Sequence, residues 1–109
     1  MRVWDQIPPY RLCRQHLLGE HREIHSIWTA LTKPGAGYQN HPEVRRWREF
    51  KPGLLRRHAL LVDEMKARGY NHRTPILVPI VTGRVGYPPP LDDQPAKLAA
   101  KNCECDTHA

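Results

Sequence analysis

Cysteine and long apolar runs are both scarce in this sequence. Three cysteines in 109 residues do not make a disulfide framework. No N-terminal apolar run resembles a signal peptide, and no apolar stretch approaches the length of a membrane span. We therefore expect a cytoplasmic protein in a reducing compartment, without membrane association.

Aromatic residues are also few, and their distribution is uneven. They make up 7% of the chain, and Tyr87 is the last of them. The sequence from Pro75 onward is instead rich in proline. We therefore expect residues 1–73 to supply the compact core as one domain, and residues 74–109 to form an extended proline-rich arm and tail that packs on or trails from it.

Acidic residues are outnumbered only in the first part of the chain. The whole chain has 17 Lys and Arg against 11 Asp and Glu; up to Arg73 the counts are 14 and 7, and beyond it they are 3 and 4. A basic folded part suggests a polyanionic partner, most often nucleic acid. A soluble basic protein without such a partner has the same composition.

Apolar spacing predicts an all-α domain of three main helices. The first covers residues 10–31, where Leu12, Leu17, Ile24, Trp28 and Leu31 fall in one stripe. Gly19 weakens this helix or marks a close approach by another backbone. Residues 33–37 (KPGAG) form a loop.

Two further helices follow the loop. The second is capped by Asn40, has Pro42 in its first turn and runs to about Phe50, where Pro52 and Gly53 end it. The third begins near Leu54 and ends at a C-terminal glycine, Gly69. In the arm, residues 76–81 suggest a packed extended segment, and residues 95–102 one or two helical turns.

One stripe of the first helix carries candidate chemistry. His16, Glu20, Glu23 and Ile27 lie within roughly 60° of one another at about 100° per residue. This stripe borders the apolar one, so partial burial and mutual repulsion should raise the pKa of at least one glutamate, which suits proton transfer. The alternative is an ordinary boundary helix whose carboxylates pair with arginines such as Arg22 and Arg57.

The same helix resembles the first long helix of the pyrimidine-dimer DNA glycosylases of the phage type. The resemblance includes Gln15-His16-Leu17, Glu20 and the pair Arg22-Glu23. Residues 54–71 resemble that family's third helix with its Arg-Gly-aromatic-Asn ending. The match covers about two thirds of the chain. It implies that residues 1–73 are a helical DNA-repair domain, a compact fold of three helices that acts on double-stranded DNA with a damaged base or abasic site.

The resemblance also implies a mechanism. Family members cut the glycosidic bond at a pyrimidine dimer and then nick the abasic site, with the α-amine of the chain as nucleophile. Glu23 holds the place of the family's catalytic glutamate, while Gln15, His16 and Arg22 match its DNA-contacting helix. Arg2 aligns with an arginine that follows the nucleophile. Because Arg2 is too large for methionine removal, we expect retained Met1 to supply the amine.

An α-amine suits this role on chemical grounds. Its pKa of about 7.7–8.0 leaves a useful neutral fraction at physiological pH, and a neutral amine can form a Schiff base with a sugar. No metal or organic cofactor is required. We expect a monomer. Further phosphate contacts are expected from Arg45, Arg46, Arg48 and Lys51, and the alternative for each of these residues is a solvated position on the helix surface.

Several alternatives remain open at this stage. Ser26 and His25 stand where the family has arginine and proline, so the lesion can be a pyrimidine dimer, another damaged base or an abasic site. Trp4 is either a wedge beside the DNA or, more in keeping with its type, a core or lid residue. In place of an enzyme, the chain can be a non-catalytic basic helical nucleic-acid-binding module. A third candidate function is that of a small protein–protein adaptor.

Two groups of residues have side chains of the types that bind zinc. His21 and His25 stand four residues apart, and Cys103, Cys105 and His108 lie near the end of the chain. No set of four ligands among them has a recognised spacing, so we expect no metal site. The Cys-Glu-Cys sequence is more typical of a mobile terminus.

Overall fold

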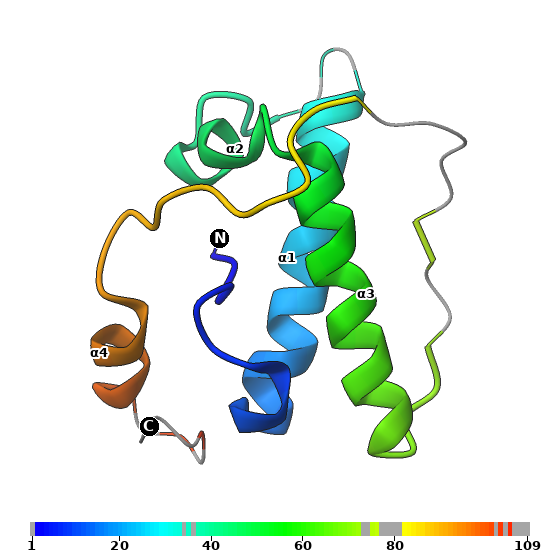
Figure 1. The fold of residues 1–109 in the computed structure, drawn as a ribbon, viewed down its shortest axis with the longest axis vertical. Helices are drawn as coiled ribbons and strands as arrows, with labels where there is room; N and C mark the ends of the chain where they lie inside the picture. Colours follow the sequence, from blue (N-terminus) through cyan, green and yellow to red (C-terminus); the bar gives the residue numbers. More distant parts are fainter. Residues whose placement is uncertain are drawn as a thin grey trace.

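The protein is described by a computed structural model that covers residues 2–33, 35, 37–72, 75–76, 82–101, 103 and 105. One 3-10 helix and four α-helices form the fold (Figure 1): η1 (Pro9–Arg11), α1 (Arg14–Thr32), α2 (Pro42–Trp47), α3 (Lys51–Ala67) and α4 (Gln94–Ala99). These described residues contain no strand, which confirms the all-α prediction. No helix among them is both long and apolar enough to cross a membrane.

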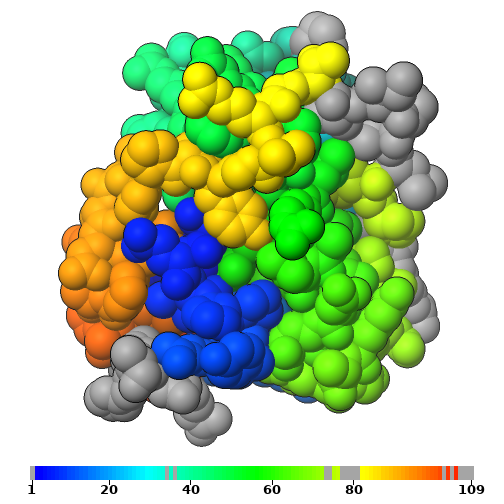
Figure 2. All heavy atoms as spheres, in the orientation of Figure 1, coloured from blue at the N-terminus to red at the C-terminus, as the bar shows by residue number. Residues whose placement is uncertain are grey.

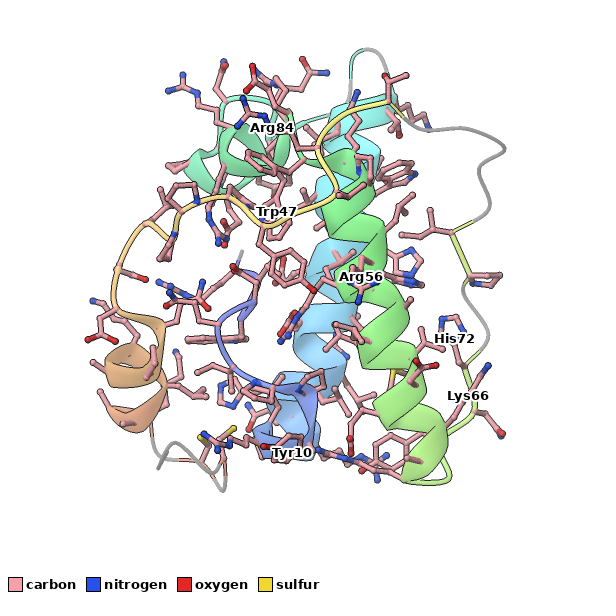
Figure 3. The ribbon with its side chains drawn as sticks, in the orientation of Figure 1. Tyr10, Trp47, Arg56, Lys66, His72 and Arg84 are labelled. Atoms are coloured by element: carbon pink, nitrogen blue, oxygen red, sulfur yellow. The ribbon has the colours of Figure 1, made fainter. Side chains whose placement is uncertain are left out.

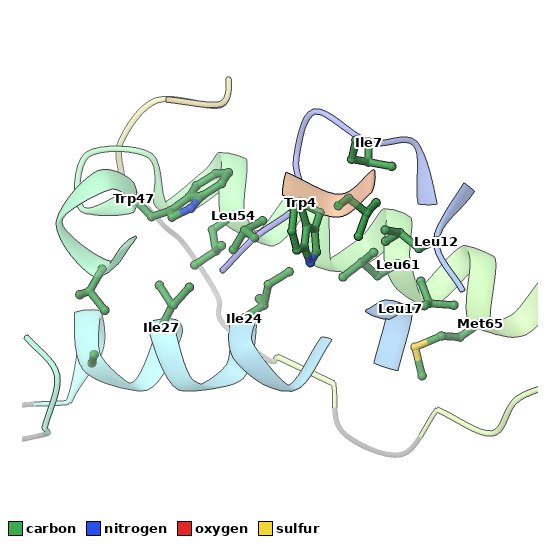
Figure 4. Packing of buried hydrophobic residues seen from close by; sticks show 14 residues of the cluster. Trp4, Ile7, Leu12, Leu17, Ile24, Ile27, Trp47, Leu54, Leu61 and Met65 are labelled. Atoms are coloured by element: carbon green, nitrogen blue, oxygen red, sulfur yellow. The ribbon is translucent and has the colours of Figure 1, made fainter. Parts of the chain in front are cut away.

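The core lies between the two long helices and the N-terminal segment. α1 and α3 run side by side, and α2 lies across one end of the pair (Figure 1). Among the described residues, fourteen buried apolar side chains form a single cluster, which is seen from close by in Figure 4. Its members on the long helices repeat at helical spacing, as in Leu17, Ile24 and Ile27 of α1 and Leu54, Leu61 and Met65 of α3. Burial of each large apolar side chain contributes about 1.5–3 kcal/mol.

The helix boundaries differ from the sequence prediction at three places. The first helix begins at Arg14, because the chain makes the separate turn η1 before it. The cap of α2 is His41, whose Nδ1 accepts a hydrogen bond from the Glu43 N–H at 3.1 Å, so the prediction of Asn40 was wrong. Pro52 and Gly53 belong to the first turn of α3. The backbone N–H groups of a first turn have no acceptor within the helix, so a proline there removes no helical hydrogen bond. Gly69 ends that helix with φ of 83°, as predicted.

The second half of the arm is part of the folded body. Residues 82–93 pass over the start of α3 and descend to α4, and Figure 2 shows the N-terminal segment between α4 and α3. Leu98 of α4 is 1% exposed and belongs to the core, which therefore extends beyond the expected residues 1–73. The predicted turns near residue 95 are confirmed as α4. Of the predicted extended segment 76–81, residues 77–81 lie outside the described residues.

A buried glutamine fixes α4 on the N-terminal segment. Gln94 donates from Nε2 to the Val3 carbonyl at 3.1 Å and to Asp5 Oδ1 at 2.9 Å. Its Oε1 accepts from the Gln6 N–H at 2.9 Å. All polar atoms of the buried amide thus have partners, which avoids the cost of an unsatisfied group. The two ends of the described chain are held together by this contact.

The crossing of residues 82–93 over α3 requires a glycine, which gives a first prediction. A Cβ at Gly53 would lie 1.9 Å from the carbonyl oxygen of Gly86. Gly53→Ala should therefore push the crossing segment away and lower the free energy of unfolding by about 1–3 kcal/mol in chemical denaturation. Gly86→Ala is the matched control, because a Cβ there meets no atom within 4 Å. Equal effects of the two variants would contradict the close crossing.

Candidate active site

The stripe singled out on the first helix opens into a cleft. A cavity of about 330 Å³ is lined by Arg2, Trp4, His16, Gly19, Glu20, Glu23 and Lys101. His16, Glu20 and Glu23 therefore share one site, as their spacing on α1 predicted. Ile27, the fourth member of the stripe, is buried in the core instead. Arg2 and Trp4 of the N-terminal segment complete the walls, together with Lys101, which lies two residues after the end of α4.

The buried carboxylate of the cleft is Glu20. It is 2% exposed, and it accepts hydrogen bonds from Arg57 Nε at 2.6 Å and from Arg57 Nη2 at 3.0 Å. Arg57 Nη2 also donates to the Trp4 carbonyl at 2.6 Å. Burial raises the pKa of Glu20, and the charge and hydrogen bonds of Arg57 oppose that rise. The expectation of a raised carboxyl pKa holds for this residue, and so does the alternative that it pairs with an arginine.

Glu23 is the cleft's second carboxylate, and its surroundings differ. It is half-buried and forms no ion pair with any residue that the structure describes. It also lines a neighbouring cavity of about 280 Å³ with Ser26, Tyr38 and His41. Glu23 is thus reachable from two sides, and no cation of the described residues is paired with it. A carboxylate in this position can exchange a proton with a bound molecule.

Arg2 is held at the cleft by the arm. Its Nη1 and Nη2 donate to the two carboxylate oxygens of Asp92 at 2.5 and 2.8 Å. The guanidinium lies 4.9 Å from the centre of the Trp4 ring. This hydrogen bonding between Arg2 and Asp92 lowers the pKa of Asp92 and raises the pKa of Arg2. Trp4 itself is 4% exposed and belongs to the core cluster, which agrees with the core interpretation of this residue.

Two lining residues were not expected from the sequence. Lys101 was overlooked because the segment after Arg73 carries no net positive charge and was expected to be an arm. For Gly19 the sequence left two interpretations open, and the close backbone approach is the wrong one, because a Cβ there would meet only the Arg22 side chain, at 4.0 Å. The glycine instead leaves part of the cleft wall without a side chain.

The side chains predicted to contact DNA do not all reach solvent. Gln15, Arg22, Arg45 and Arg48 are exposed, and Lys51 is half-buried. The Arg46 side chain is 3% exposed and pairs with Asp5 at 2.6 Å and Glu43 at 2.8 Å. It also donates to two backbone carbonyls of the arm, those of Pro88 and Pro89. Its donors are therefore used inside the fold, and no face of it is left for a phosphate.

The fold also brings together two groups of side chains of the types that bind metals, and His16 is the one member that also lines the cleft. One consists of Cys13, His16, Cys103 and Cys105, and the other of His21, His25, His58 and His72. In each group the ligand atoms lie within 4.8 Å of one another. The sequence offered the pair His21 and His25, but the partners are distant in the chain and only the fold brings them together.

A sequence model of one family, described as pyrimidine dimer DNA glycosylase, matches residues 1–77. The chain belongs to the pyrimidine dimer DNA glycosylase family. No curated protein and no solved structure matches it. The family match confirms the resemblance noted in the sequence, and membership makes DNA the substrate and base removal the activity.

The boundary of the family match separates two parts of the cleft. The matched residues 1–77 include every lining residue except Lys101. They end before the crossing segment, α4, and the cysteines Cys103 and Cys105. The cleft is therefore built largely from the region that the family model matches, and Lys101 of the C-terminal part closes one wall.

Proposed function

We propose that this glycosylase removes a damaged pyrimidine, with a pyrimidine dimer as its lesion, and then cleaves the strand at the abasic site through a Schiff base on the α-amine of Met1. Met1 lies outside the described residues. The observation that carries the proposal is that Arg2, its neighbour in the chain, lines the same cleft as Glu23, a half-buried carboxylate with no ion pair among the described residues.

The proposed chemistry uses only this chain's groups. The neutral amine attacks C1′ of the damaged nucleotide, the glycosidic bond breaks with its electron pair going to the base, and the base takes up the proton that the attacking amine loses. Glu23 gives a proton to the ring oxygen as the sugar opens, which leaves an iminium between the amine and C1′. The Glu23 carboxylate then removes a proton from C2′, and the 3′ phosphate leaves by β-elimination. Water hydrolyses the remaining Schiff base and restores the amine.

The surroundings of the cleft support DNA as the ligand of this site. Arg2 and Lys101 flank the carboxylates within the cleft, and Gln15 and Arg22 lie exposed on the same helix. These groups would hold phosphates while the target nucleotide leaves the stack, since its C1′ is shielded in duplex DNA. A non-catalytic binding module has no use for Glu23 here, because a carboxylate repels phosphates.

Borohydride trapping tests the proposed nucleophile. Purified protein is mixed with duplex DNA that carries a pyrimidine dimer or an abasic site, the Schiff base is reduced, and the adduct is mapped by mass spectrometry. We expect one covalent adduct at the Met1 amine on both substrates. Lys101 is the competing amine in the cleft, so an adduct there would replace Met1 as the nucleophile.

The matched control carries a few extra residues before Met1. This extension moves the α-amine away from the cleft without altering any lining side chain, so salt-dependent DNA binding should persist while trapping is lost. Tight binding without an adduct from the unextended protein, on either substrate, would leave the binding module as the function.

A further inference from the structure

Four imidazoles from three segments meet at one point. His21 and His25 come from α1 and His58 comes from α3. His72, labelled in Figure 3, belongs to the segment that follows α3. The Nε2 atom of His21 lies 3.1 Å from that of His58, 3.3 Å from that of His25 and 3.1 Å from that of His72. The Nε2 atoms of His25 and His58 are 3.2 Å apart. The same atom of each ring therefore faces the same centre.

Hydrogen bonds among these rings cannot account for the arrangement. A neutral imidazole nitrogen carries either one proton or one lone pair, so it can make one strong N–H···N bond. Nε2 of His21 has three nitrogen neighbours at hydrogen-bond distance and can satisfy only one of them at a time. Protonating the rings would place cations in contact with one another. A shared cation at the centre resolves the crowding, because each ring then offers a lone pair to it.

The distances fit a tetrahedral zinc ion. Four nitrogens at about 2.0–2.1 Å from zinc define a regular tetrahedron with edges of about 3.3–3.4 Å. The four Nε2–Nε2 separations of 3.1–3.3 Å are close to those edges. Imidazole is a ligand that zinc accepts readily, and four protein ligands leave no open position for a substrate. We propose that His21, His25, His58 and His72 bind one structural zinc ion that joins α1, α3 and the segment beyond it.

A second set of atoms supports a second site independently. His16 Nδ1 lies 3.2 Å from Cys13 Sγ and 3.3 Å from Cys105 Sγ, and Cys103 completes a group within 4.8 Å. Three thiolates and one imidazole form a standard structural zinc set, here with Cys-x-x-His and Cys-x-Cys spacings. A zinc ion at this position would join the start of α1 to the C-terminal segment. It would also fix the His16 ring in the cleft wall while leaving Nε2 for DNA.

Metal content measures both sites without reference to catalysis. Tag-free protein is equilibrated with Zn²⁺, separated from free metal by gel filtration and analysed by plasma mass spectrometry; we expect two zinc ions per chain. His25→Gln and Cys103→Ser should each retain one ion, and the double variant none. His41→Asn is the matched control and should retain two, because His41 is outside both groups and asparagine is a good helix cap.

Each outcome decides a site. A count unchanged by His25→Gln overturns the histidine site, a count unchanged by Cys103→Ser overturns the cysteine site, and less than one ion in the wild-type protein overturns both. Should either variant fail to fold, X-ray absorption at the zinc edge of the wild-type protein decides instead. Two sites predict more nitrogen than sulfur around zinc, whereas sulfur in excess would overturn the histidine site.

Discussion

Glu23→Gln is expected to lower the single-turnover rate of base removal and strand cleavage by about 10²–10⁴-fold, the usual range for loss of a general acid or base. The amide can neither give a proton to the opening sugar nor remove one from C2′. Affinity for lesion DNA should stay the same or rise, because a negative charge leaves a cleft flanked by Arg2 and Lys101. Single-turnover kinetics and salt-matched binding titrations on the same duplex measure the two effects separately.

The matched control for this change is Glu49→Gln. Glu49 is exposed and does not line the cleft, so its amide should leave turnover unchanged. Full turnover by Glu23→Gln would contradict the proposed role of Glu23, and the proton transfers would then have to come from another group of the cleft. A parallel loss of binding and rate would instead indicate that Glu23 shapes the site without transferring protons.

Arg57→Met is expected to lower the free energy of unfolding by about 3–5 kcal/mol, as happens when one partner of a buried ion pair is removed. The change leaves Glu20, 2% exposed, without its cation and the Trp4 carbonyl without the Nη2 donor. Chemical denaturation measures the loss. Arg56→Met is the matched control: it removes the same side-chain type one position earlier, at an exposed site, and should cost less than about 0.5 kcal/mol.

The same variant has a defined pH dependence. Burial raises the pKa of Glu20, and Arg57→Met removes the group that opposes this. The folded state then keeps a proton that the unfolded state loses above its pKa of about 4.3, so stability falls as the pH rises from that value toward the folded pKa. Stability that rises with pH across this window, relative to the wild-type protein, would contradict the assignment. The double variant Glu20→Met, Arg57→Met should recover most of the loss, because no unpaired charge stays buried.

Glu20 and Glu23 illustrate how burial separates two similar residues. They stand three positions apart on α1 and line one cleft, yet Glu20 is held by Arg57 and Glu23 has no ion pair among the described residues. The pair formed by Glu20 and Arg57 also holds the Trp4 carbonyl, and thereby the segment that leads back to Arg2. Glu20 is thus held in an ion pair that stabilises the cleft, and Glu23 is the carboxylate that we propose for proton transfer. This division explains why the two variants above should affect different measurements.

The sequence by itself determined the helices, the family and the shared cleft. Apolar spacing places Leu17, Ile24, Leu54 and Leu61 on faces that can only be buried against each other, and the pattern of residues 11–31 carries the family resemblance. His16, Glu20 and Glu23 lie on one face of α1 because residues three, four and seven positions apart in a helix share a face, and this depends only on the local backbone. The helix boundaries near Asn40 and Pro52 were less accurate, because a histidine can cap a helix and a proline can begin one.

Only the tertiary structure decided which partners meet across the chain. Arg46 was expected to contact DNA, but it is enclosed by Asp5 and the arm. Lys101 was not predicted, and it lines the cleft because α4, which ends two residues before it, packs against the N-terminal segment. The ligand groups around His21 and Cys13 include residues up to 92 positions apart in the chain. Spacing along a chain constrains neighbours within a few helical turns, whereas contacts between distant segments follow from how the core packs.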